Sequence, residues 1–240
     1  MMSLILSAEL LLLYFLSAAV SRALYRFFTL LFRTRPIAVS LLLAIQFPGT
    51  VIHELAHLFT AEILGVQTGK LRLEPESIRE ESIQAGSVMI AETDPVRRAL
   101  IGLAPLFWGM TALAALSYFI PTLYESVFAF GLPLWENRDF YLLFGVGYLL
   151  YAVSNTMFPS PVDMQGVTPI LIALVGISVL GGVLGVQIPI SIAVAEVVSQ
   201  LILTLTKSLG VVLGLNIVLL SLAHLLIIWF SRLLRVRVTN

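Results

Sequence analysis

The segment Val51-Ile52-His53-Glu54-Leu55-Ala56-His57 places two histidines and a glutamate inside a long apolar run. On an α-helix, residues four apart share a face, so His53 and His57 point the same way and Glu54 lies on the adjoining flank. Two imidazole nitrogens can then bind one zinc ion while the carboxylate reaches a water beside it, which is the chemistry of an HExxH motif. The segment therefore predicts a metal-binding helix in apolar surroundings.

The alternative interpretation of this segment is a chance motif whose histidines are satisfied by neighbouring helices. Each acid at the centre of a membrane costs about 2.5 kcal/mol or more. Three ionisable side chains within His53–His57 are therefore hard to explain without a role. Two of the three histidines of the chain lie here, which also favours the metal site.

The composition is that of a membrane protein. Of the 240 residues, 59% are hydrophobic and 12% are charged, and the mean hydropathy is +1.00, far from the balance of a soluble domain. The formal net charge is zero, so no basic surface points to nucleic acid. There is no cysteine, so a metal would have to be held by His, Asp or Glu.

Apolar runs long enough to cross a bilayer, which takes about 20 residues, recur along the chain. The first carries Glu9 and has no basic region ahead of it, so we expect a retained helix rather than a cleaved signal peptide. The stretch 191–206 is ambiguous, because Glu196 and Gln200 give it a polar stripe that suits either a span or an interfacial helix. The predicted fold class is an α-helical polytopic membrane protein, one membrane domain over residues 1–240, with six or seven transmembrane helices. The predicted helices are residues 3–32, 38–65, 96–120, 139–158, 164–188 and 209–232, with 191–206 as the doubtful seventh.

Residues 67–98 interrupt this pattern, because they hold most of the charged side chains outside the termini. Residues 70–74 alternate between polar and apolar, and residues 82–91 form a second strand-like run. We therefore expect a small β-sheet at the membrane surface between the second and third helices.

An HExxH pair supplies two metal ligands, whereas a catalytic zinc ion usually has three from the protein. The candidates in apolar context are Asp163, Glu196, His224 and Glu62. Asp163 is preferred because it follows Pro159 and Pro161, which must break one membrane helix before the next begins. Broken backbone at membrane depth is tolerated only where it is buried in protein or lines a cavity, so an acid beside it suggests a site.

With these residues in view, the sequence resembles the site-2 proteases, membrane-embedded zinc peptidases that cut transmembrane segments of other proteins. His53–His57 and the residues after it look like the first metal motif of that family. Asn155 and Asp163, eight residues apart with Pro159 and Pro161 between them, are similar to its Asn-Pro-Asp-Gly element. The resemblance covers residues 38–188 as a catalytic core that includes the surface β segment 67–98, and leaves 189–240 as C-terminal helices.

The resemblance implies a set of roles. His53, His57 and Asp163 would hold one zinc ion per chain, Glu54 would be the catalytic base, and Asn155 would contact the substrate or the developing oxyanion. The implied function is intramembrane zinc metalloendopeptidase activity on transmembrane segments, as in regulated intramembrane proteolysis. The implied partners are a transmembrane protein substrate and the lipid bilayer, with no nucleic acid, and the expected location is multi-pass in the cell membrane.

Two alternatives remain open from the sequence. One is a non-catalytic zinc-binding membrane protein, such as a pseudoprotease with a regulatory role or a metal-binding transporter. Glu54 between the histidines argues against it, because mere metal binding does not require that acid. The other is a different membrane metalloprotease class in which Glu196 completes the zinc site. The oligomeric state is not determined by the sequence.

Overall fold

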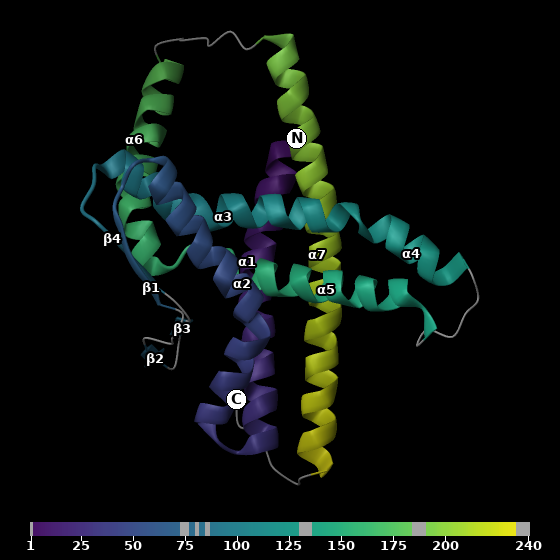
Figure 1. Ribbon diagram of the computed structural model, residues 1–240. Coiled ribbons are helices and arrows are strands. Elements are labelled where there is room, and N and C mark those ends of the chain that lie inside the picture. Colours follow the sequence, from purple (N-terminus) through teal and green to yellow (C-terminus); the bar gives the residue numbers. More distant parts are fainter. Residues whose placement is uncertain are drawn as a thin grey trace.

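The computed structural model describes residues 2–72, 77–79, 82–84, 87–129, 136–183 and 191–233. Seven helices dominate this described part of the chain (Figure 1). They are α1 (Met2–Phe32), α2 (Arg35–Ile63), α3 (Pro95–Tyr118), α4 (Ile120–Ala129), α5 (Arg138–Thr156), α6 (Pro161–Val183) and α7 (Ile192–Leu233).

Several helices have the length and composition of membrane spans. Four described segments qualify alone, and a fifth results if α5 and the first part of α6, which meet at 63°, count as one broken span. The four are Leu4–Phe32, Arg35–Ile63, Pro95–Phe128 and Val194–Leu233. The predicted helical fold is therefore confirmed, whereas the predicted number of six or seven spans is not.

The C-terminal region differs most from the prediction. The sequence leaves open whether 191–206 is a span and predicts a separate helix at 209–232, but the structure has the single 42-residue helix α7. The polar residues Glu196 and Gln200 lie exposed on its surface and do not interrupt it. No proline occurs within α7, so nothing in the backbone chemistry stops the helix there.

Between α2 and α3 the described backbone forms two antiparallel strand pairs rather than one sheet. α2 ends in a left-handed turn at Gly65 (φ 68°), which leads into β1 (Thr68–Arg72). β1 pairs with β4 (Ser87–Ile90), and β2 (Ser77–Arg79) pairs with β3 (Ser82–Gln84). The location of these strands at a membrane surface stays a prediction.

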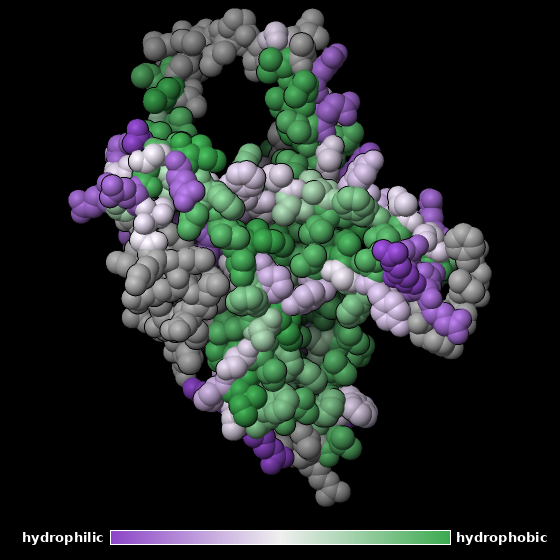
Figure 2. All heavy atoms as spheres, in the orientation of Figure 1, coloured by the Kyte–Doolittle hydropathy of each residue, from purple (hydrophilic) through white to green (hydrophobic). Residues whose placement is uncertain are grey.

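α1 and α7 run side by side along the length of the molecule, and α3 and α5 cross them (Figure 1). Leu13 of α1, Leu113 of α3, Leu150 of α5 and Leu209 of α7 belong to one buried cluster at this crossing. The outward faces are apolar as well, and Figure 2 shows hydrophobic residues over most of the visible surface of the helices. Exposed apolar faces of this extent suit a hydrocarbon environment rather than water.

The crossing of α2 and α5 is unusually close. A Cβ atom on Gly49 would overlap the carbonyl oxygen of Ala152 and the hydroxyl of Thr156. Small residues allow helix backbones to approach this closely. In a membrane, where lipid tails are as apolar as the side chains, the van der Waals contacts made in this way help to hold helices together. Gly49 thereby brings the turn that carries His53 against the end of α5.

We expect Gly49→Ala to destabilise the protein by about 1–3 kcal/mol, as overpacking does, although alanine favours a helix over glycine by about 1 kcal/mol. Thermal unfolding of the detergent-purified protein measures this. Gly176→Ala is the matched control, because at that exposed position of α6 a Cβ atom would have no atom beyond its own stretch of helix within 4 Å. Equal unfolding temperatures for the two variants would contradict the close crossing.

Candidate metal centre

The HExxH segment lies in the last third of α2, as the sequence predicts. The imidazole rings of His53 and His57 face each other edge to face, with centroids 4.9 Å apart. His57 and Glu54 are buried, and His53 is partly buried. The helix therefore presents both imidazoles on one face with the carboxylate enclosed beside them.

Asp163 reaches the same place from the break between α5 and α6. Pro161 is the first residue of α6, a position that tolerates proline because no helical N–H bond is needed there. Ser160 and Asp163 cap this helix start reciprocally: the backbone N–H of Ser160 donates to Asp163 Oδ2 at 2.7 Å, and that of Asp163 lies 3.3 Å from Ser160 Oγ. The cap fixes the direction of the carboxylate.

Each histidine is oriented by a backbone carbonyl from another helix. His53 Nδ1 lies 2.6 Å from the carbonyl oxygen of Thr156, at the end of α5. His57 Nδ1 lies 2.8 Å from the carbonyl oxygen of Ile101, within α3. A carbonyl only accepts, so each Nδ1 must carry the hydrogen, and a neutral ring held in this way presents the lone pair of Nε2. This is the arrangement in which histidine binds a metal.

The two Nε2 atoms and the carboxylate converge. His57 Nε2 is 3.3 Å from Asp163 Oδ1, and His53 Nε2 is 3.8 Å from Asp163 Oδ2. The candidate ligand atoms all lie within 4.8 Å of one another. Atoms bound about 2.0–2.1 Å from a tetrahedral zinc ion lie about 3.3 Å apart, so the three residues fit the ion. Contacts this short need a positive charge among them, which either a bound cation or a proton on an imidazole Nε2 supplies.

The other predicted ligand candidates lie elsewhere. Glu196 and Glu62 are exposed on α7 and α2. His224 is exposed on α7, where its ring lies against the carbonyl of Leu220 in the same helix. Within the described ranges, His53, His57 and Asp163 form the one group of three His, Asp or Glu side chains close enough to hold a metal.

Asn155 precedes Thr156, whose carbonyl holds His53, but its own side chain is held by other partners. Its Nδ2 donates to Asn216 Oδ1 at 2.9 Å and to the carbonyl of Tyr151 at 2.8 Å. Asn216, fully buried on α7, also donates to Ser154 Oγ at 3.1 Å. This polar network connects α5 with α7, and the oxyanion role of Asn155 stays a prediction.

Sequence reasoning missed several residues that shape the centre. Asn216 was detectable as a lone amide in an apolar run. Ser160 was detectable from the spacing Ser-x-x-Asp, which is typical of a helix cap. The carbonyls of Thr156 and Ile101 carry no side-chain signal, so their roles appear only in three dimensions.

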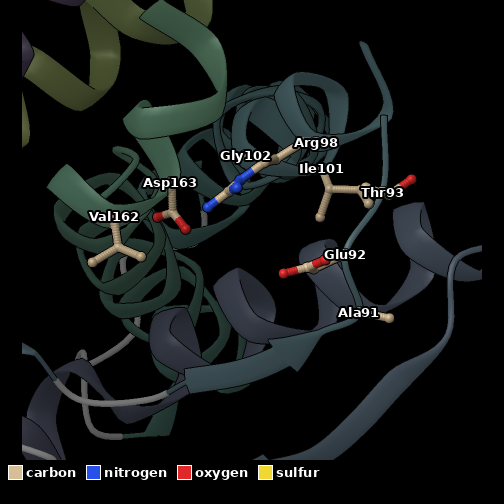
Figure 3. Close-up of a pocket in the computed structure, with 8 residues that line it drawn as sticks. All are labelled: Ala91, Glu92, Thr93, Arg98, Ile101, Gly102, Val162 and Asp163. Carbon is tan, nitrogen blue, oxygen red and sulfur yellow. The ribbon is translucent and has the colours of Figure 1, made fainter. Parts of the chain in front are cut away.

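A cavity of about 320 Å³ opens beside Asp163. In Figure 3 the carboxylates of Asp163 and Glu92 and the guanidinium of Arg98 point into it. Gly102 lines the same cavity, and a Cβ there would lie 2.5 Å from the Asp163 carbonyl oxygen. The cavity thus gives one of the candidate metal ligands an opening lined partly by polar side chains.

Fold and site together define a helical protein with several helices suited to a membrane and a candidate His2Asp metal centre among them. Comparisons of the chain with models of known protein families, with curated proteins and with solved structures give no match. The functional argument therefore depends on the geometry and chemistry of the centre.

We expect close to one zinc ion per purified chain, and at least about 100-fold weaker zinc binding in Asp163→Ala, because a lost ligand should exceed the 10–100-fold effect of a lost outer contact. Elemental analysis together with chelator competition measures both quantities. Glu196→Ala is the control and should bind zinc like the wild type. If Glu196→Ala lost zinc while Asp163→Ala retained it, the third ligand would be Glu196 on α7 and not Asp163.

Proposed function

We propose that this chain is an intramembrane zinc metalloendopeptidase of the site-2 protease type, which cleaves transmembrane segments of other membrane proteins in regulated intramembrane proteolysis. The observation that carries the proposal is the convergence of His53, His57 and Asp163 on helices of membrane-spanning character, with Glu54 buried beside them. The proposed location is the cell membrane.

The donor set favours a hydrolytic site over a storage or structural one. Structural zinc sites are closed by four protein ligands, whereas catalytic sites have three and keep one position open. Three donors converge in the described chain, and a cavity adjoins one of them, Asp163. When bound, zinc supplies Lewis-acid chemistry: it polarises a carbonyl and makes water a better nucleophile at neutral pH.

Glu54 is the proposed general base. It lies one residue after His53 on α2 and is 5% exposed. Its carboxylate is therefore in low-dielectric surroundings, where it would exchange a proton with the reacting groups rather than with bulk solvent. In the proposed reaction it takes a proton from the attacking water and passes it to the leaving amine. The two Nδ1–H bonds keep the imidazoles from rotating during these steps.

The substrate must present a peptide bond in an unfolded stretch. The backbone groups of a membrane helix bond within the helix, so a scissile carbonyl is accessible only where the helix locally unwinds. The cavity lined by Glu92, Arg98 and Asp163 offers polar groups to such a stretch and would have room for water. We therefore propose transmembrane segments weakened by polar or helix-breaking residues as the substrate class.

The test uses a synthetic transmembrane peptide, about 20 apolar residues with a central Asn-Gly pair, reconstituted with the protein in lipid vesicles. We expect zinc-dependent cleavage near the pair, identified by mass spectrometry. Glu54→Gln should reduce the cleavage rate by about 10²–10⁴-fold, because that is the contribution of a general base, while still binding zinc. Glu62→Gln, on an exposed part of the same helix, is the control.

Two results would count against the peptidase. Undiminished cleavage by Glu54→Gln would remove the proposed base. Zinc-loaded wild-type protein that leaves the peptide intact would favour the alternative of a non-catalytic zinc-binding protein or regulatory pseudoprotease.

A further inference from the structure

Pro105 lies inside α3, four residues after Ile101. In an α-helix the N–H of each residue donates to the carbonyl four residues earlier, but proline has no N–H and its ring displaces that carbonyl. The carbonyl released by Pro105 is that of Ile101. It is the same carbonyl that accepts from His57 Nδ1, at 2.8 Å.

The other histidine is held in a corresponding way. The Thr156 carbonyl at the end of α5 would accept from the N–H of Ser160 if the helix continued. That N–H donates to Asp163 Oδ2 instead, at 2.7 Å. The Thr156 carbonyl is thereby available to His53 Nδ1, at 2.6 Å. Each imidazole thus uses a carbonyl that a proline-containing irregularity has left without its helical donor.

The bond between His57 and the Ile101 carbonyl lies in buried surroundings. Ile101 is 1% exposed and Pro105 is among the fully buried residues, so water does not replace a missing partner. A buried carbonyl without a hydrogen bond is rare and costly, and the His57 N–H satisfies it. In return the bond fixes which nitrogen of His57 carries the hydrogen and where Nε2 points.

We propose that Pro105 is a positioning residue of the metal centre, which releases the Ile101 carbonyl and so holds His57 in its metal-binding tautomer and orientation. The inference rests on the metal site of the proposed function and concerns metal affinity, not proteolysis. A proline that served only to bend or pack α3 would affect stability and leave zinc binding unchanged.

The experiment compares Pro105→Ala and Pro105→Val, which restore the N–H, with Pro169→Ala. Pro169 also lies inside a helix, α6, but the carbonyl four residues before it belongs to Gln165 and does not bond either histidine. Zinc affinity is measured by chelator competition and ligand geometry by the visible spectrum of the Co²⁺-loaded protein. Thermal unfolding of the metal-free proteins reports the fold, and valine keeps volume in the core if alanine leaves a gap.

We expect both Pro105 variants to bind zinc about 10–100-fold more weakly than the wild type and to alter the Co²⁺ spectrum, because that is the range for lost outer contacts. At least one should unfold no earlier than the wild type, and Pro169→Ala should bind zinc normally. Unchanged affinity in folded Pro105 variants, or equal weakening in Pro169→Ala, would overturn the inference and leave the peptidase proposal intact. If the wild type bound no zinc, both this inference and the peptidase proposal would be contradicted. If it bound zinc but did not cleave the peptide, only the peptidase proposal would be contradicted.

Discussion

The interior of this protein depends on one constraint: in apolar surroundings, every backbone polar group needs a partner from the protein itself. Two prolines at the α5–α6 break and one within α3 leave backbone groups without helical partners. The candidate metal ligands supply several of the missing bonds. His53 and His57 donate to carbonyls, and Asp163 accepts from the N–H of Ser160. The helix irregularities and the metal centre therefore stabilise one another.

Glycines make these long-range bonds possible. Gly49 brings α2 against α5, and Gly102 brings α3 against the first turn of α6, in each case with no room for a Cβ atom. His53 on α2 thereby reaches a carbonyl of α5. Asp163 of α6 is held beside α3, whose Ile101 carbonyl accepts from His57. The centre is thus assembled by helix crossings that bulky residues would forbid.

The sequence predicted the parts of this arrangement that depend on local chemistry. The spacing of His53 and His57 determines a shared helix face, and Pro159 with Pro161 determines a break beside Asp163. Contacts between residues far apart in the sequence could not be predicted. Pro105 indicates that the Ile101 carbonyl lacks its helical donor, but it does not indicate that His57 donates to that carbonyl. The polar stripe of Glu196 and Gln200 also left open whether 191–206 spans or lies in the interface, whereas the structure makes this stretch the first part of the continuous helix α7.

The depth of the centre follows from its neighbours on α1. Leu13 packs in the same buried cluster as Leu150 and Met157, and Val20 packs with Ala152, so the end of α5 lies level with this part of α1. Leu13 and Val20 lie near the middle of the candidate span Leu4–Phe32. For an α1 that crosses the bilayer, the His53 contact with α5 then lies far from both membrane surfaces. The proposed hydrolysis would therefore need water and an unwound peptide to come to the centre, and the cavity beside Asp163 would have to admit them.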